Sequence, residues 1–245
     1  MLIAKTELNH IMRKIDIIAT IGPSSIDRAV LRKMASEGMT IARINTKYGS
    51  TEQYKEIMDN LKGAKCKILF DIDNLDVIEW INAQEFDYLA VSFAESAEQI
   101  RKIREKVGKD VRIISKIENR KGIDNIDDLI RESDGIMVAR GDLGDNIPME
   151  KVPIFQKLII RKCNRSGKMA ITATEMLLSM TKSEVPERAE VSDVANAVLD
   201  GSDALMLSEE TAIGVNPVLV VKTMGKIVKE TQKDEHILSF MLKSK

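Results

Sequence analysis

The stretch Ile113–Gly144, IISKIENRKGIDNIDDLIRESDGIMVARGDLG, decides the fold. It contains two short apolar runs, Ile113–Ile117 and Gly135–Val138, and the segment between them repeats apolar residues at three- and four-residue spacing, as an amphipathic helix does. A strand, a helix and a second strand in this order form a right-handed unit with parallel strands. Both strands therefore end on the same side of the sheet, where α/β proteins build their sites.

Charged residues follow both strands of this unit. Lys116 and Glu118 end the first strand, and Arg140 and Asp142 end the second. Two carboxylates on adjoining strand ends suit a hard divalent cation such as Mg²⁺, and Lys116 beside them would neutralise an anionic substrate. A surface ion-pair cluster is the alternative. We favour the metal site, because crowded charges cost desolvation energy unless a ligand organises them.

The rest of the chain repeats the same alternation of strands and helices. Eight strand-like runs are expected at Lys14–Ile21, Thr40–Ile44, Cys66–Phe70, Tyr88–Phe93, Arg112–Ile117, Gly135–Ala139, Met169–Thr172 and Ala204–Leu207. Helical patterns include Asp27–Glu37, Thr51–Leu61, Ser96–Lys106, Ile154–Arg165, Val191–Leu199 and Pro217–Lys229. The pattern predicts one α/β domain over residues 1–245, a closed (β/α)8 TIM barrel with residues 1–13 as a short extension.

Polar residues gather at the predicted carboxyl ends of the strands, which converge on one mouth of such a barrel. They are Thr20–Ser25, Arg43, Asn45, Asp71, Asp73, Ser92, Lys116, Glu118, Arg140, Asp142, Thr172, Thr174, Ser208 and Glu210. This set suits a metal-bridged small molecule that carries a phosphate or carboxylate. The segment GDLGDNIP after the sixth strand is either the start of a short helix with anion-binding N–H groups or an ordinary glycine loop.

Composition excludes several classes of partner. Charged residues make up 31% of the chain but the formal net charge is -1, so no global field attracts nucleic acid or an anionic membrane. Every apolar run is too short to span a bilayer. Cys66 and Cys163 lack metal-ligand spacing and are expected to be reduced core residues. These features predict a soluble cytoplasmic protein that binds neither nucleic acid nor membrane.

Several motifs resemble the barrel domain of pyruvate kinase, and together they extend over about residues 14–226. The matching stretches are TIGPSS (Thr20–Ser25), ARIN (Ala42–Asn45), VSF (Val91–Phe93), SKIENRKGIDNIDDL (Ser115–Leu129), SDGIMVARGDLG (Ser133–Gly144), KCNRSGK (Lys162–Lys168), ITATEML (Ile171–Leu177), RAEVSDVANAVLDGSDALMLSEETA (Arg188–Ala212) and NPV (Asn216–Val218). The resemblance implies a TIM barrel of the phosphoenolpyruvate/pyruvate type.

The resemblance also implies roles for the charged residues. Glu118 and Asp142 would bind Mg²⁺ or Mn²⁺, and Lys116 would stabilise a transferring phosphoryl group and a developing enolate. Arg43 would contact phosphate. The ligand would be a small anionic metabolite such as phosphoenolpyruvate, pyruvate or oxaloacetate.

The remaining implied site residues hold the substrate or supply protons. Thr174 and the backbone of Gly141 and Asp142 would bind the substrate carboxylate, and Arg140 belongs to the same predicted substrate-binding set. Ser208 and Glu210 match residues on the proton-delivery side of the enolate.

The chain departs from the family after the third strand. There the family inserts a lid domain, whereas this sequence reads DIDNLDVIEW (Asp71–Trp80), and Asp73 replaces a family lysine. The sequence ends at Lys245, soon after the eighth helix, so we also expect no C-terminal regulatory domain. A lid excludes water and completes the charge clamp around nucleotide phosphates. Without one, phosphoryl transfer to ADP should be impaired.

A second departure affects the family's monovalent cation site. Asn45 and Asp71 are retained as a remnant, but Lys47 stands where the family has a serine ligand. The Lys47 ammonium could replace K⁺, because two like charges within a few ångströms would repel each other. The alternative is that Lys47 points to solvent. We expect no requirement for K⁺.

Three functions remain open at this point. The first is a divalent-metal-dependent enzyme acting on phosphoenolpyruvate, pyruvate or a related 2-oxo acid through an enolate. The others are a lidless 2-oxo acid lyase or decarboxylase, and a non-catalytic protein that binds a phosphometabolite or a protein partner. A homodimer is expected, because the segment Met176–Val191 resembles a region near a subunit contact in the family.

Overall fold

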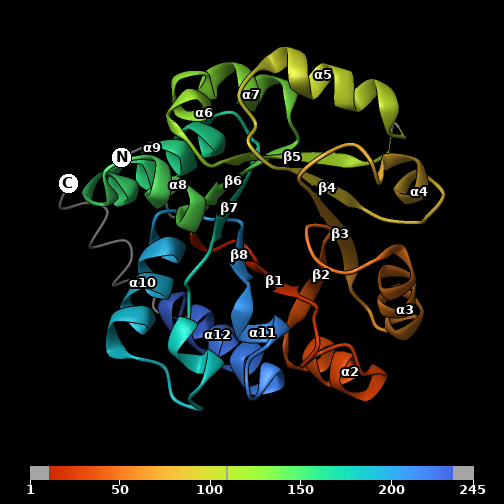
Figure 1. Ribbon diagram of the computed structural model, residues 1–245. Coiled ribbons are helices and arrows are strands. Elements are labelled where there is room, and N and C mark those ends of the chain that lie inside the picture. Colours follow the sequence, from red (N-terminus) through yellow and green to blue (C-terminus); the bar gives the residue numbers. More distant parts are fainter. Residues whose placement is uncertain (1–10, 109, 234–245) are drawn as a thin grey trace.

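The computed structural model describes residues 11–108 and 110–233 of the protein. Eight parallel strands close into a barrel in sequence order, with β8 hydrogen-bonded to β1. Helices surround the strands (Figure 1). The predicted closed (β/α)8 barrel is therefore confirmed. The strands are β1 (Asp16–Thr20), β2 (Met39–Asn45), β3 (Lys67–Ile72), β4 (Tyr88–Val91), β5 (Arg112–Ile117), β6 (Gly135–Ala139), β7 (Met169–Ala173) and β8 (Ala204–Leu207).

The helices follow the strands as the alternation predicts, with several short ones added. They are α2 (Arg28–Glu37), α3 (Thr51–Leu61), α4 (Ile78–Asn82), α5 (Ala97–Lys106), α6 (Arg120–Asp124), α7 (Ile126–Glu132), α8 (Arg140–Asn146), α9 (Val152–Arg165), α10 (Arg188–Leu199), α11 (Glu209–Ala212) and α12 (Pro217–Thr231), with the 3₁₀ turns η1 (Met149–Lys151) and η2 (Leu178–Thr181). No described helix is long and apolar enough to cross a membrane.

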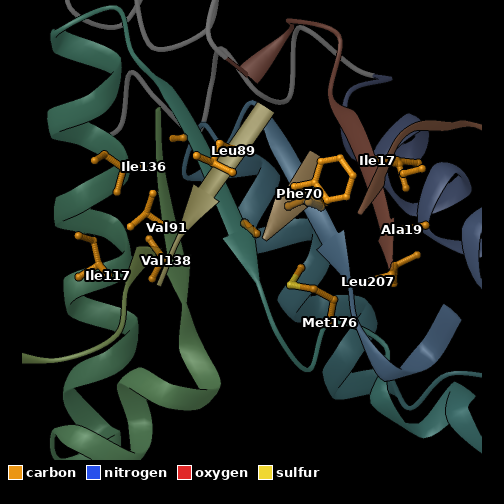
Figure 2. Packing of buried hydrophobic residues seen from close by; sticks show 14 of the residues in the cluster. Ile17, Ala19, Phe70, Leu89, Val91, Ile117, Ile136, Val138, Met176 and Leu207 are labelled. Atoms are coloured by element: carbon orange, nitrogen blue, oxygen red, sulfur yellow. The ribbon is translucent and has the colours of Figure 1, made fainter. Parts of the chain in front are cut away.

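Side chains of each strand alternate between two apolar layers. An outer layer between strands and helices includes Ile17, Ala19 and Phe70, and Figure 2 shows how its members pack. An inner layer fills the barrel and includes Ile18 and Leu69. Because successive residues of a strand face opposite sides, the next inward position after each inner residue lies two residues further along. This alternation positions the site described below.

Hydrogen bonds tie the strands together in pairs at the amino-terminal end of the barrel. The backbone N–H of Ile17 donates to Thr40 Oγ1, over 3.0 Å, and links β1 to β2. Aspartates that directly precede β4, β6 and β8 accept in the same way from β3, β5 and β7. These bonds are Ile68 N to Asp87 (2.9 Å), Ile113 N to Asp134 (2.8 Å) and Ala170 N to Asp203 (2.9 Å). Each even strand thus satisfies a backbone donor of the preceding odd strand.

The helix predicted between β5 and β6 is interrupted. It forms two short helices, α6 and α7, that meet at Asn125. The Asn125 side chain donates to the carbonyl oxygen of Glu95 over 2.8 Å, which ties this junction to the loop after β4. Strand β4 also ends earlier than expected, at Val91, and Phe93 has a left-handed backbone with φ of 47°. Both differences arise from contacts made above the strand ends.

Strand β3 leads into α4 and then β4 without an intervening domain. Residues 73–87 contain one short helix, and its residue Trp80 packs edge-on against Tyr54 and Phe70. The ring centroids are 5.9 Å and 6.1 Å apart, within the range of favourable aromatic pairs. These contacts anchor α4 beside α3 at the edge of the barrel.

Candidate active site

A polar layer lies at the carboxyl end of the barrel, directly above the inner apolar layer. Arg43, Asp71 and Lys116 each follow an inner-layer residue by two positions, on β2, β3 and β5. Thr20 and Ser92 take the same place at the ends of β1 and β4. All five are buried. The strand alternation that builds the core therefore also directs these five side chains toward one another.

Asp71 is the centre of this layer. Arg43 approaches one carboxylate oxygen of Asp71 with both Nε and Nη2, each at 2.8 Å. The remaining Arg43 nitrogen, Nη1, donates to Thr20 Oγ1 over 2.8 Å. The second oxygen of Asp71 lies 3.1 Å from Lys116 Nζ but has no well-aligned hydrogen bond. A fully buried carboxylate is therefore shared between two cations, as a buried charge requires.

Lys116 is surrounded by three oxygen acceptors. Its Nζ lies 2.9 Å from Glu118 Oε1, 3.1 Å from Asp71 Oδ1 and 2.8 Å from Ser92 Oγ. The Ser92 hydroxyl in turn donates to Asp73 over 2.9 Å. The predicted neighbours Lys116 and Glu118 are thus brought together, and Ser92 and Asp73 extend the group toward the loop after β3.

The buried charges shift one another's pKa values. Burial by itself would lower the pKa of Lys116, but the negative charges of Asp71 and Glu118 outweigh it, so the pKa is raised. Burial would raise the pKa of Asp71, but Arg43 and Lys116 hold it below its usual value. Burial raises the pKa of Glu118, and Lys116 offsets this only in part. Asp71 is therefore firmly ionised, whereas Glu118 takes up a proton more readily.

Glu118 and Asp142 are the two predicted ligands of a divalent cation. Glu118 Oε2 accepts the backbone N–H of Phe93 over 2.5 Å, and its other oxygen faces Lys116. Asp142 is exposed, and its negative charge further raises the pKa of Glu118. Among residues 11–108 and 110–233, no cluster of three or more acids, histidines or cysteines could hold a metal alone. Two carboxylates completed by water and substrate oxygens are a usual environment for Mg²⁺.

Arg140 holds the loop after β7 in an unusual conformation. Thr174 and Glu175 have left-handed backbones, with φ of 78° and 55°. Arg140 Nη2 donates to the Thr174 carbonyl oxygen over 2.6 Å, and its Nη1 lies 2.8 Å from Asp193 Oδ1. The guanidinium thus has protein partners, and substrate binding by Arg140 stays a prediction.

Of the two alternatives left open for the segment after β6, the short helix is present, as α8. No described side chain caps its first turn, so the amides of Gly141 and Asp142 are available to an anion. Gly141 also packs against Thr174, because a Cβ built on it would lie 2.8 Å from Thr174 Cγ2. The structure therefore brings Gly141 next to Thr174, and binding of a substrate carboxylate by Gly141, Asp142 and Thr174 stays a prediction.

Glu210 is fully buried and accepts backbone hydrogen bonds. Its oxygens accept from Leu177 N, over 3.1 Å, and Ser208 N, over 2.6 Å. Burial raises the pKa of Glu210, and these amides offset the shift only in part. This arrangement holds together the loops after β7 and β8. A role in proton delivery for Glu210 or the half-buried Ser208 stays a prediction.

The sequence left open whether Lys47 replaces K⁺ at the remnant site of Asn45 and Asp71. Asp71 does not lack a partner, because Arg43 and Lys116 both pair with it. The Lys47 side chain is exposed, and no ion pair of it is present in the described part of the chain. Its backbone N–H donates to Asn45 Oδ1 over 3.1 Å. The geometry favours the alternative that Lys47 points to solvent.

A cavity of about 450 Å³ opens beside the polar layer, between the ends of β1, β2 and β8 and helix α3. Its lining includes Thr20, Pro23, Arg43, Tyr48, Tyr54 and Ser208. Sequence reasoning missed this cavity, because its walls include apolar and aromatic residues that resemble ordinary core. It also missed Phe93 and Asp193, whose contacts with Glu118 and Arg140 join residues distant in sequence.

Comparison with protein families gives a match over most of the chain. The family described as "Pyruvate kinase, barrel domain" matches residues 12–69 and 66–221. The two matched segments meet within β3, the strand after which the chain continues directly into α4.

Curated relatives and a solved structure agree with this match. A pyruvate kinase from Clostridium perfringens is 51% identical over 152 residues, which is 60% of this chain and 32% of the relative. A probable cytosolic pyruvate kinase isozyme from Arabidopsis thaliana is 48% identical over 167 residues, 67% of this chain and 34% of the relative. A crystal structure of a pyruvate kinase from Cryptosporidium parvum superposes with a TM-score of 0.86 at 28% identity, covering 91% of this chain and 70% of that one. The matches span about a third of the length of these curated relatives.

Proposed function

Because the chain belongs to the pyruvate kinase family through its barrel domain, we propose that it binds a small 2-oxo acid or the phosphorylated enol of one. The ligand would lie at the carboxyl end of the barrel, where Lys116 and a divalent metal stabilise an enolate. The observation that carries this proposal is the buried cluster in which Lys116 lies within 3.1 Å of both Asp71 and Glu118. Burying charged groups costs free energy, and clusters of buried charge are commonly found at functional sites.

The protein's own residues would perform most of the work. Lys116, whose pKa is raised, would remain protonated and place a positive charge beside the enolate oxygen as it forms. Arg43 is already held by Asp71 and Thr20, so its guanidinium is oriented before a ligand arrives. The carboxylate of the substrate would be bound by the amides of Gly141 and Asp142 and by Thr174. Preorganised charges of this kind stabilise a transition state without reorganising during the reaction.

Mg²⁺ or Mn²⁺ would be held by Glu118 and Asp142. When bound, it would supply a Lewis acid that polarises the oxygens of the ligand. Burial raises the pKa of Glu118 and Lys116 offsets the shift only in part, so a divalent cation bound there would favour the ionised carboxylate. The raised pKa of Glu118 supports a divalent metal at this residue over an ion pair with Lys116 alone.

We propose enolate chemistry as the reaction, in preference to phosphoryl transfer to ADP. Between β3 and β4 the described chain contains no domain that could close over the mouth and exclude water. Loss of CO₂ from oxaloacetate would leave its bonding electrons as the enolate of pyruvate, which then takes a proton at carbon. Proton exchange at the methyl group of pyruvate passes through the same enolate. Neither reaction needs a clamped nucleotide.

A non-catalytic binding protein is the second candidate. Lys116 is already surrounded by acceptors of the protein itself, which favours this candidate. A cluster of ion pairs can bind an anion without catalysing a reaction. A binding and turnover screen separates the two. Calorimetry with phosphoenolpyruvate, pyruvate and oxaloacetate, with and without Mg²⁺, measures binding, and NMR measures proton exchange and decarboxylation. Metal-dependent binding with turnover supports the enzyme, and binding without turnover supports the second candidate.

The proposal also covers the cellular location and the oligomeric state of the protein. By analogy with the relative described as a cytosolic isozyme, we propose that the chain acts in the cytosol. We also propose a homodimer that uses the segment Met176–Val191, where Leu178 and Val185 are exposed to 38% and 72%. Large exposed apolar side chains on one segment favour burial against a partner.

A further inference from the structure

Asp73 is linked to Lys116 although it lies outside the buried cluster. It follows β3 by one residue and is exposed. Its carboxylate accepts the Ser92 hydroxyl over 2.9 Å, and the same hydroxyl oxygen accepts from Lys116 Nζ over 2.8 Å. Two such links place an oxygen of Asp73 within about 6 Å of the Lys116 charge, a distance at which charges still interact.

The charges of the buried layer balance without Asp73. In the buried layer, the two cations Arg43 and Lys116 are matched by Asp71 and Glu118. Asp73 lies near the same group, and in the described ranges its carboxylate forms no ion pair with any lysine or arginine. Its negative charge therefore remains available to act on whatever binds beside Lys116.

We propose that Asp73 is a specificity-determining residue that makes this mouth favour a 2-oxo acid without phosphate over its phosphorylated enol. The inference rests on the function proposed above. A phosphate held between Arg43 and Lys116 adds nearly two negative charges beside Asp73. A ligand with a hydrogen or methyl group there adds none. Asp73 therefore penalises the phosphorylated ligand more than the unphosphorylated one, because like charges at this distance repel each other.

Asp73 would affect ligand affinity through its charge and not through packing. Its side chain is exposed and fills no part of the core. Asparagine is nearly the same shape and keeps an oxygen that can accept the Ser92 hydroxyl. The change Asp73→Asn therefore removes the charge while leaving the link to Ser92 possible.

The test compares the dissociation constants of phosphoenolpyruvate and pyruvate, measured by calorimetry with saturating Mg²⁺ at low and high salt. Asp73→Asn should tighten phosphoenolpyruvate about fivefold and leave pyruvate nearly unchanged, and the difference should shrink at high salt. Asp73→Glu keeps the negative charge, and this variant should behave like the unmodified protein. The matched control is Asp76→Asn, because Asp76 is exposed in the same loop and is not hydrogen-bonded to Ser92. Asp76→Asn should change the dissociation constant of neither ligand.

Three outcomes would overturn the inference. In the first, both ligands bind and Asp73→Asn leaves the ratio of their affinities unchanged, which removes the role of Asp73 and keeps the proposed function. In the second, Asp76→Asn shifts the ratio as much as Asp73→Asn, so the effect belongs to the loop's net charge. If neither ligand binds the unmodified protein, the proposed function fails, and the inference that depends on it fails too.

Discussion

The Nζ of Lys116 lies 2.9 Å from an Oε of Glu118, two residues further along the chain. Residues two apart on an extended chain face the same side, and here that side is the mouth of the barrel. Lys116 is also paired with Asp71, so its pKa is raised, whereas burial raises the pKa of Glu118. The pair therefore combines a fixed positive charge with a carboxylate that a bound cation would keep ionised. The predictions below depend on this relationship.

Removing the charge of Asp71 should destabilise the protein. Asp71→Asn leaves Arg43 and Lys116 buried without their shared partner, and breaking a buried pair of this kind costs about 3 kcal/mol. Urea unfolding followed by the fluorescence of Trp80, the single tryptophan, measures the free energy of unfolding. Asp142→Asn, at an exposed position, is the control and should change it by less than about 0.5 kcal/mol. If Asp71→Asn and Asp142→Asn change the free energy of unfolding by equally small amounts, Asp71 is not the centre of the cluster.

The metal-free protein should become less stable as the pH rises from about 4.5 through the raised pKa of Glu118. In that interval the folded state still holds a proton that the unfolded chain has released, so a rise in pH favours unfolding. Glu118→Gln should reduce this slope, and the part that remains belongs to Glu210, whose pKa burial also raises. Mn²⁺ affinity, measured by electron paramagnetic resonance, should instead increase with pH, because the metal needs the ionised carboxylate. A Mn²⁺ affinity independent of pH over this range would contradict the role of Glu118.

Adding a methyl group at Gly141 should disturb the first turn of α8, where we propose that the substrate carboxylate binds. In Gly141→Ala the new Cβ would lie 2.8 Å from Thr174 Cγ2, so the turn or Thr174 must move. Binding of a 2-oxo acid, measured by calorimetry, should weaken about tenfold, because a misplaced ligand loses its oriented contacts. Gly144→Ala is the control, since its Cβ would meet Val152 at 3.9 Å, an ordinary contact.

The same site offers a rescue experiment. Thr174→Ser removes the methyl group that Gly141→Ala would strike and keeps the hydroxyl. The double variant should therefore recover most of the lost affinity. If it binds as weakly as Gly141→Ala alone, the close contact between Gly141 and Thr174 is not the cause.

The proposed dimer is tested by sedimentation at micromolar concentration. Val185→Asp places a charge on an exposed apolar residue and should shift the protein toward the monomer, because burying that charge in an interface is costly. Ile213→Asp provides a comparison, since Ile213 is also an exposed apolar residue but lies outside Met176–Val191. A single 27.4 kDa species in the unmodified protein would exclude the dimer.

Local patterns predicted most of the fold and the centre of the site. The period of two in each strand places Arg43, Asp71 and Lys116 above the inner apolar layer, so their meeting follows from the strand pattern. The ends of elements were less predictable. The single helix expected after β5 breaks at Asn125 because its side chain bonds to Glu95, a residue 30 positions away.

Long-range contacts explain the other differences. Arg140 pairs with Asp193, 53 residues later, a contact that sequence reasoning missed, and its place in the substrate set stays a prediction. Whether Lys47 would replace a cation beside Asp71 was left open, and Asp71 is paired with Arg43 on β2 and with Lys116 on β5. Contacts such as that between Arg140 and Asp193 depend on how α8 and α10 meet outside the strands, and a period along the sequence does not encode that.

The most direct test of the account measures deuterium exchange into the methyl group of pyruvate by NMR in D₂O with Mg²⁺. The account predicts metal-dependent exchange by the unmodified protein and none by Lys116→Met, in which the charge beside the enolate is lost. Near-ultraviolet circular dichroism shows whether the variant remains folded, and Lys67→Met, at an exposed position at the opposite end of the barrel, should exchange normally. Exchange that persists in folded Lys116→Met, or its absence from the unmodified protein with Mg²⁺ and pyruvate bound, would contradict the account.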